Sequence, residues 1–199
     1  MFKRASIEAL FFIMKGKILI SSPSLLSDSI FYKSIILIVD ETDNSHVGFI
    51  LNRPGGLFLM NDSDNSAVKK YTFQFGGPVS DDTFYIIKNQ NYIDEEYRIM
   101  DGISWGKDVQ LIINRIENRM IDLNDVIFFQ GYSGWDINQL NEEISSDSWI
   151  VLDESDLNIF ELSGKKSWGK ILKKLGNKYR IWWDRSEEHT SELQSPVTI

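Results

Sequence analysis

The chain has 199 residues, of which 42% are hydrophobic, and this length and composition fit one globular domain. Lys and Arg number 21 against 29 Asp and Glu, and the net charge of -8 disfavours binding to a phosphate backbone, which depends on basic side chains. Cys is absent, so disulfides, thiolate catalysis and Cys-ligated metal sites are excluded, and we expect a cytoplasmic protein.

Both ends of the chain are predicted to lie outside the domain. Residues 1–13 hold two basic residues and a short apolar run without a cleavage pattern, which favours an extension from a mis-called start, with Met14 as the true start. Residues 185–199 read RSEEHTSELQSPVTI, and most of this stretch matches the in-frame translation of a common DNA sequencing adapter. We therefore expect a read-through artefact there and a domain that spans residues 14–184. No run is long enough to span a bilayer.

The first half of the chain predicts β-strands. Apolar, β-branched runs at 34–41 and 47–54 flank a short polar stretch and indicate a hairpin, with His46 near its tip. Pro54 cannot donate to a strand ladder and is predicted to end the second strand. Residues 60–70 are predicted to form a polar surface loop. Further strands are expected at 15–22, at 71–82, where Gly76, Gly77 and Pro78 interrupt the run, and at 83–89.

The second half mixes helices with strands. A buried strand is expected at 125–131, after which Asp136 caps a helix and Gln139 completes a capping box. A strand at 148–153 and a helix at 167–176 follow. Hairpin strands followed by mixed elements favour an α+β fold in a single domain. Another helix is predicted from one apolar stripe at helical spacing, formed by Val109, Ile112, Ile113 and Ile116.

The stretch VIFFQGYSGWDINQLNEEI, at 126–144, resembles the strand–turn–helix setting of a hydrolase nucleophile elbow, with Ser133 in the turn. The chain departs from that pattern because Trp135 stands where the elbow has its second Gly. A serine nucleophile also needs a base, and neither histidine is well placed to supply one. We interpret the turn as architecture or as a binding loop, in which Gly131 and Gly134 carry the strand into the helix and Trp135 packs over the junction.

A basic segment lies near the end of the predicted domain. Between residues 165 and 180 every charged residue is Lys or Arg, and YRIWW at 179–183 adds aromatic side chains. Contact with nucleic acid or a membrane surface is one interpretation, and a solvated helix face on an acidic domain is the other. Acidic residues such as Asp81 and Asp82 show no metal-ligand spacing, and we expect neither a metal nor a cofactor.

Three blocks together resemble the YqgE/AlgH family: GFILNRP at 48–54, FGGPVSDD at 75–82 and GYSGWDINQLNEEI at 131–144. GKILISSP, DSIFYKSIILIVDE, SWIVL and SWGKILKKLGNKYRIWW extend the resemblance over nearly all of 14–183. It implies a bacterial cytoplasmic protein whose mixed, mostly antiparallel sheet folds into a pseudo-barrel with flanking helices. The family has no established catalytic reaction, and Ala is common in it where this chain has Ser133.

We expect a non-enzymatic binding or regulatory domain with a protein or small-molecule partner. Because sites usually lie in loops at strand ends, three loop segments are predicted to lie close together in space. These segments are residues 52–54, 76–78 and 131–135. The alternative is that their glycines only satisfy turn geometry and that Arg53 caps a carbonyl. Two other interpretations are an enzyme with Arg53 as anion clamp and Asp81 or Asp82 as base, and a nucleic-acid-associated transcriptional regulator. The candidate site residues are Asn52, Arg53, Gly76, Gly77, Pro78, Gly131, Tyr132, Gly134 and Trp135.

Overall fold

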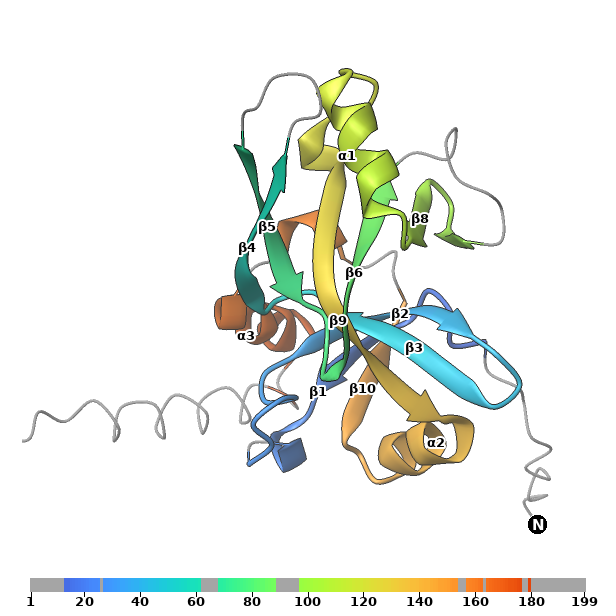
Figure 1. Ribbon diagram of the computed structural model, residues 1–199. Helices are drawn as coiled ribbons and strands as arrows, with labels where there is room; N and C mark the ends of the chain where they lie inside the picture. Colours follow the sequence, from blue (N-terminus) through green and yellow to red (C-terminus); the bar gives the residue numbers. More distant parts are fainter. Residues whose placement is uncertain are drawn as a thin grey trace, which may run out of the picture.

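The computed structural model describes residues 13–25, 27–61, 68–88, 97–153, 157–162, 164–176 and 179 (Figure 1). In this part of the chain the strands form one ten-stranded sheet, which three α-helices flank. The strands are β1 (Ile18–Ser21), β2 (Ile35–Glu41), β3 (Ser45–Ile50), β4 (Pro54–Asn61), β5 (Val68–Phe75), β6 (Val79–Lys88), β7 (Arg98–Met100), β8 (Ile103–Gly106), β9 (Val126–Asp136) and β10 (Trp149–Leu152).

Neighbouring strands follow the order β10-β1-β2-β3-β9-β6-β8-β7, and β4 joins this path through β5, which pairs with β9. Every pair is antiparallel except β5 with β9, which is parallel. The path ends at β10 and β7, which do not pair with each other, so the sheet of the described residues is open. The α+β class and the mostly antiparallel sheet are confirmed, and the implied pseudo-barrel is not a closed one.

Strand β9 connects the two halves of the molecule (Figure 1). Its first half pairs with β6 on one edge and β5 on the other, and its second half pairs with β3. Successive side chains of a strand point to opposite faces. Phe129 therefore packs with β2, β3 and Trp168, whereas Phe128 packs under the helix that covers β5 and β6. We call the part around β4–β8 the α1 half and the part around β1–β3 and β10 the α2 half.

Helices α1 (Val109–Glu117) and α2 (Ile137–Ser145) begin where the sequence predicts them. The Asp108 side chain caps α1 by accepting from Leu111 N, and Ile112 and Ile113 are buried as the apolar stripe requires. Asp136 caps α2 by accepting from Asn138 N. The Gln139 side chain donates forward to Glu143 at 2.9 Å instead of completing a capping box.

Helix α3 (Gly164–Lys174) begins three residues earlier than expected. Trp168 and Leu172 are fully buried on one face of this helix, and the Trp168 indole Nε1 donates to Ser21 O at 2.8 Å. Lys166, Lys170, Lys173 and Lys174 are exposed on the other face. The helix is therefore amphipathic, and its buried face closes the core against β1.

Strand β4 corrects the prediction that Pro54 ends a strand. Pro54 opens β4, and residues 60 and 61, expected in a loop, belong to the strand. A Cβ on Gly55 would lie 2.5 Å from the Phe73 ring, so the ring packs directly on the glycine backbone. Two glycines, usually unfavourable in strands, are used here because an aromatic ring covers them. The short β7 and β8 were not predicted, since three or four residues carry too little periodicity.

In the described residues, no helix combines the length and apolar character that membrane crossing needs. The predicted extensions 1–13 and 185–199 lie outside the described residues, apart from Ile13.

Candidate functional site

The three predicted loop segments meet at the middle of β9. Arg53 O accepts from Phe75 N at 2.9 Å, and Gly76 N donates to Gln130 O at 2.8 Å. Gly76 O in turn accepts from Ile50 N at 3.0 Å and from the Ser133 hydroxyl at 3.2 Å. The prediction that these segments lie close together is confirmed.

Glycines are required at this point because the chain crosses itself. Strands β5 and β6 pair with opposite edges of β9, so the connection between them has to pass over β9. A Cβ on Gly76 would lie 2.2 Å from Gly131 O, and one on Gly77 would lie 2.2 Å from Tyr132 C. Gly131 has φ +68°, a conformation that favours glycine, and a Cβ on it would lie 2.5 Å from Gly77 O. We call Gly76, Gly77 and Gly131 the glycine crossing.

Ser133 lies inside a strand rather than in a turn. Strand β9 continues to Asp136, so the predicted strand–turn–helix at Gly131–Gly134 was wrong. The Ser133 side chain is fully buried, and its hydroxyl donates to Gly76 O. His46 lies beside the hairpin turn as expected, but it is only 4% exposed, and in β3 it pairs with Trp135 of β9. The serine therefore fastens the glycine crossing and is not an accessible nucleophile.

Asn52 is a structural connector. Its side chain is buried, and Oδ1 accepts from Ile35 N at 2.9 Å. Nδ2 donates to Lys33 O at 2.9 Å and to Gly164 O at 3.4 Å. One amide thus ties the start of β2 and the start of α3 to the end of β3, and its hydrogen-bonding groups are occupied.

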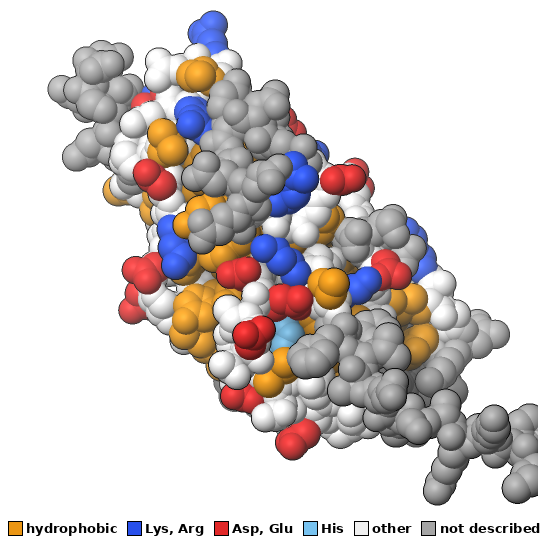
Figure 2. Space-filling model, turned by 90° about the vertical axis from the view of Figure 1, so that its right-hand side faces the viewer, with side chains coloured by type: hydrophobic (Ala, Val, Ile, Leu, Met, Phe, Trp, Pro, Cys, Tyr) orange, Lys and Arg blue, Asp and Glu red, His pale blue; other side chains and the backbone are white. Residues whose placement is uncertain are grey.

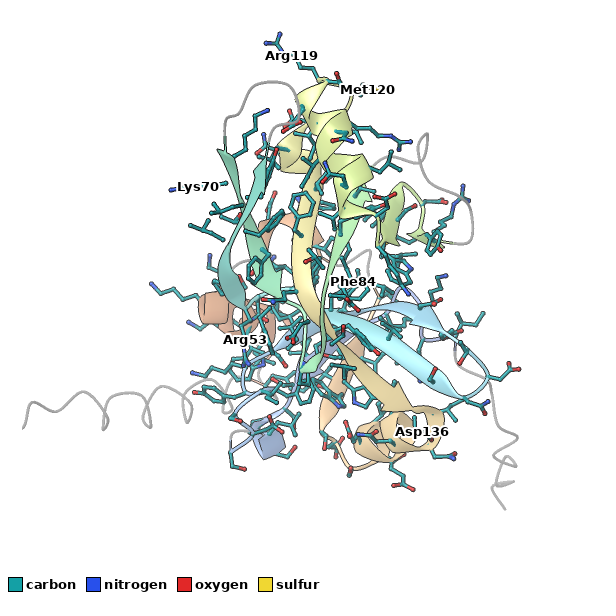
Figure 3. All side chains as sticks on the ribbon, viewed as in Figure 1. Arg53, Lys70, Phe84, Arg119, Met120 and Asp136 are labelled. Atoms are coloured by element: carbon teal, nitrogen blue, oxygen red, sulfur yellow. The ribbon has the colours of Figure 1, made fainter. Side chains whose placement is uncertain are left out.

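Arg53 is half-buried beside the glycine crossing (Figure 3). Its guanidinium lies 5.7 Å from the centre of the Phe75 ring, and Nη1 donates to Ser29 O at 3.4 Å. Burial lowers the pKa of Arg53, and the Asp28 carboxylate partly opposes that shift. Because the negative charge of Asp28 acts on the guanidinium and Nη1 donates to a backbone carbonyl, the surroundings of Arg53 do not favour an anion clamp.

The two candidate bases are exposed to solvent. Asp81 and Asp82 are exposed in the bulge of β6 between Val79 and Thr83. The Ser80 hydroxyl donates to Asp82 Oδ2 at 2.6 Å. An acid–base site would need a carboxylate held in a pocket beside Arg53, and these two side chains do not supply it.

Trp135 is part of the core of the α2 half. It is 3% exposed, and its Nε1 donates to Glu143 Oε2 at 3.0 Å. Trp149 donates to the same oxygen at 2.7 Å. Tyr132 is half-buried with its ring edge-on to Phe84, at 5.8 Å between centres. Of the nine candidates, Pro78 and Gly134 are the exposed ones.

The sequence analysis missed an exposed apolar edge on the α1 half. Strand β4 pairs with β5 and, within the described residues, with no other strand. Leu57 and Leu59 are 60% and 61% exposed on this edge strand. The sequence did contain a signal for this edge strand. Leu57 and Leu59 alternate with Phe58, which packs on the core, and β4 has no charged residue. The expected strand end at Pro54 hid it.

A groove of about 420 Å³ lies on the other side of β5, between β5 and β9. It forms because β5 and β9 pair only over Phe73–Phe75 and separate toward their starts. Lys70 and Thr72 line it on the β5 side, and Ile127 and Phe160 line it opposite. Cross-strand pairs share a face, and Leu57 pairs with Thr72 and Leu59 with Lys70. The groove and the exposed leucines therefore lie on one face of the sheet.

Comparison with known proteins identifies the family to which this chain belongs. A family model described as AlgH-like matches residues 18–180. The chain belongs to the AlgH-like family. A UPF0301 protein of Cytophaga hutchinsonii is 30% identical over 171 residues, covering 85% of this chain and 93% of the relative. Another, from Bacteroides fragilis, is 33% identical over 174 residues, covering 84% and 86%.

Two solved structures share the fold. The solution structure of the AlgH protein from Pseudomonas aeruginosa has a TM-score of 0.66 at 18% identity, covering 88% of this chain and 94% of that one. The crystal structure of DIP2367 from Corynebacterium diphtheriae has a TM-score of 0.62 at 18% identity, covering 85% and 91%. At this identity the likeness concerns the fold alone, and it agrees with an α+β domain of one open sheet.

Proposed function

We propose that this AlgH-like chain is a non-enzymatic domain that binds another protein through the edge of β4. The observation that carries the proposal is the pair Leu57 and Leu59, each about three-fifths exposed on a strand whose outer edge has no partner among the described residues. Natural proteins usually blunt such edges with charges or short strands. β4 has eight residues and no charge. An edge left in this form is suited to pairing with another chain.

The residues predicted from the sequence take a supporting part in this proposal. The glycine crossing joins the two halves, Asn52 and Trp135 have structural roles, and Arg53, Pro78, Tyr132 and Gly134 remain candidate contact residues. A regulatory role fits a domain that works by binding, and the family resemblance implies a location in the bacterial cytoplasm. The enzyme interpretation has weaker support, because Ser133 is buried and Asp81 and Asp82 are exposed.

A pull-down from the native bacterial cytosol tests the binding function. The wild-type chain is compared with Leu57→Glu/Leu59→Glu, and the matched control is Leu111→Glu, which changes a leucine 40% exposed on α1. We expect a protein that is retained by the wild type and by the control and lost from the edge variant. Partners retained equally by all three chains would contradict the proposal.

Substrate profiling tests the enzyme interpretation separately. We expect no turnover by the wild-type chain over a broad panel of substrates. A turnover that Arg53→Ala abolishes, with the fold intact by circular dichroism, would replace the binding function with a catalytic one.

A further inference from the structure

Charge is distributed unevenly over the elements around β4. Strand β4 has no charged residue, β5 has Lys69 and Lys70, and α3 has five lysines. None of these three elements contains an Asp or Glu, although the chain as a whole has a net charge of -8. β5 and α3 are therefore basic elements in an acidic protein, although Lys69 forms an ion pair with Glu117 of α1 at 2.9 Å.

Helix α3 and β4 lie on the same side of the molecule. Asn52, two residues before β4, donates to Gly164 O at the first residue of α3. Figure 1 shows α3 beside the starting end of β4, and Figure 3 shows Lys70 projecting outward on this side. Figure 2 views the opposite side, where acidic and basic side chains lie next to one another. Lys70 and the exposed lysines of α3 therefore lie on the β4 side.

Resting on the proposed protein-binding function, we propose that the edge of β4 binds an extended segment of a partner protein whose side chains on one face are aliphatic in the middle and acidic at the flanking positions. Backbone hydrogen bonds to the free edge of β4 supply the pairing, as in other cases of strand addition. Aliphatic side chains of the segment cover Leu57 and Leu59. Its carboxylates face Lys70 and the exposed lysines of α3.

Other kinds of partner fit these observations less well. Exposed leucines provide neither the aromatic stacking nor the arginines with which proteins usually hold single-stranded nucleic acid. A lipid surface would leave the backbone groups of the strand edge without hydrogen bonds, which is costly in an apolar medium. A second copy of this chain would bring two basic β4 sides together. An acidic extended peptide satisfies the backbone, the leucines and the lysines at the same time.

The test is a selection of peptides on the full chain. A random library of peptides about ten residues long, a length matched to β4, is selected on the wild type. The selected peptides are then titrated calorimetrically into Leu57→Glu/Leu59→Glu, into Lys70→Glu, and into the controls Leu111→Glu and Lys107→Glu. All these side chains are exposed, so the substitutions leave the core intact, and circular dichroism checks the fold.

We expect the selected peptides to carry aliphatic residues two positions apart, flanked on the same face by Asp or Glu. Their affinity should fall about tenfold or more in both β4-side variants and stay within about twofold in both controls. Affinity for the wild type should fall with added salt, and amide hydrogen exchange in β4 should slow on binding.

Different failures separate this inference from the proposed function. Peptides that need Leu57 and Leu59 but contain no acidic residues would overturn the acidic chemistry and leave the binding function standing. No selected peptide, or peptides that bind the edge variant as well as the wild type, would overturn the β4 site. A dimer seen by light scattering that Leu57→Glu/Leu59→Glu dissociates would assign the edge to a second copy. Binding of phosphatidylglycerol vesicles or single-stranded DNA that the same variant abolishes would overturn the inference too.

Discussion

Gly76 and Gly134 lie close to one another near β9, yet we predict opposite outcomes when each is changed to Ala. A Cβ on Gly76 would lie 2.2 Å from the backbone oxygen of Gly131, and backbone cannot move aside as a flexible side chain can. A Cβ on Gly134 would meet the Tyr132 ring at 3.4 Å, an ordinary contact. Gly76→Ala should cost about 3 kcal/mol or more, whereas Gly134→Ala should stay within about 1 kcal/mol.

Equilibrium unfolding in urea measures both glycine variants against the wild type. If Gly76→Ala fails to fold, Gly134→Ala still tests the steric argument, because a comparable loss there would contradict it. A loss of less than about 1 kcal/mol for Gly76→Ala would show that the glycine crossing can relax.

His46 makes stability depend on pH. Burial lowers its pKa from 6.5, and the nearby Glu41 carboxylate, 3.9 Å from Nε2, opposes that shift. Since the folded-state pKa is below that of the unfolded chain, the unfolded chain binds more protons in the window between them. Stability is therefore full above about pH 6.5 and falls as the pH drops through that window toward the folded-state pKa.

The variant His46→Gln should remove this dependence. Urea unfolding at several values between about pH 8 and pH 5, a range in which most carboxylates stay ionised, measures the slope of stability against pH. The wild type should lose stability toward the acid end, and His46→Gln should lose less. Equal slopes in the two proteins would mean that the buried imidazole does not control stability in this window.

At the scale of elements, Glu143 attaches α2 to the sheet. One carboxylate oxygen, Oε2, accepts from the indole Nε1 of Trp135 on β9 and of Trp149 on β10. Glu143→Ala would leave two indole donors without this acceptor at positions that are 3% exposed. We expect a loss of about 2–4 kcal/mol, since each unsatisfied buried donor costs about 1–3 kcal/mol. The exposed neighbour Glu142 on the same helix provides the control Glu142→Ala, expected within about 0.5 kcal/mol.

Tryptophan fluorescence during urea unfolding measures the stability of both variants, because Trp135 and Trp149 report on their own environment. A loss in Glu143→Ala no larger than that in Glu142→Ala would show that water replaces the carboxylate without cost.

The elements that sequence periodicity predicts are those whose neighbours lie nearby in the chain. The apolar stripe of α1, the cap of α2 at Asp136 and the hairpin of β2 with β3 depend on local patterns and are confirmed. The extent of β4 and the continuation of β9 through Ser133 depend on contacts between distant segments. From the sequence, Gly55 indicates a strand break and Gly131 a turn. In the structure the Phe73 ring covers Gly55, and β5 and β6 pair with the strand that contains Gly131.

The position of the candidate site could be predicted from the sequence, but whether its residues bind a ligand or only pack on one another could not. The sequence indicated that the three loop segments would meet, and they do, because strand ends gather where the chain changes edge. Whether such a cluster binds a ligand or packs on itself depends on interatomic distances. A polar residue such as Asn52 gives no sign in the sequence that its amide is occupied by Ile35, Lys33 and Gly164.

At the scale of the whole molecule, β9 should make the two halves unfold together. Phe129, at its centre, is fully buried and stacks on Phe49 of β3 at 4.7 Å between ring centres. The same strand carries Phe128 under α1 and Trp135 against α2. Phe129→Ala should therefore destabilise both halves by the same amount, about 3–5 kcal/mol. Hydrogen exchange in α1 and α2, followed under increasing denaturant, measures the opening of each half. The two helices should lose protection at a common midpoint in the wild type and at a common, lower midpoint in Phe129→Ala, and separate midpoints in either protein would show that β9 joins two independently folding halves.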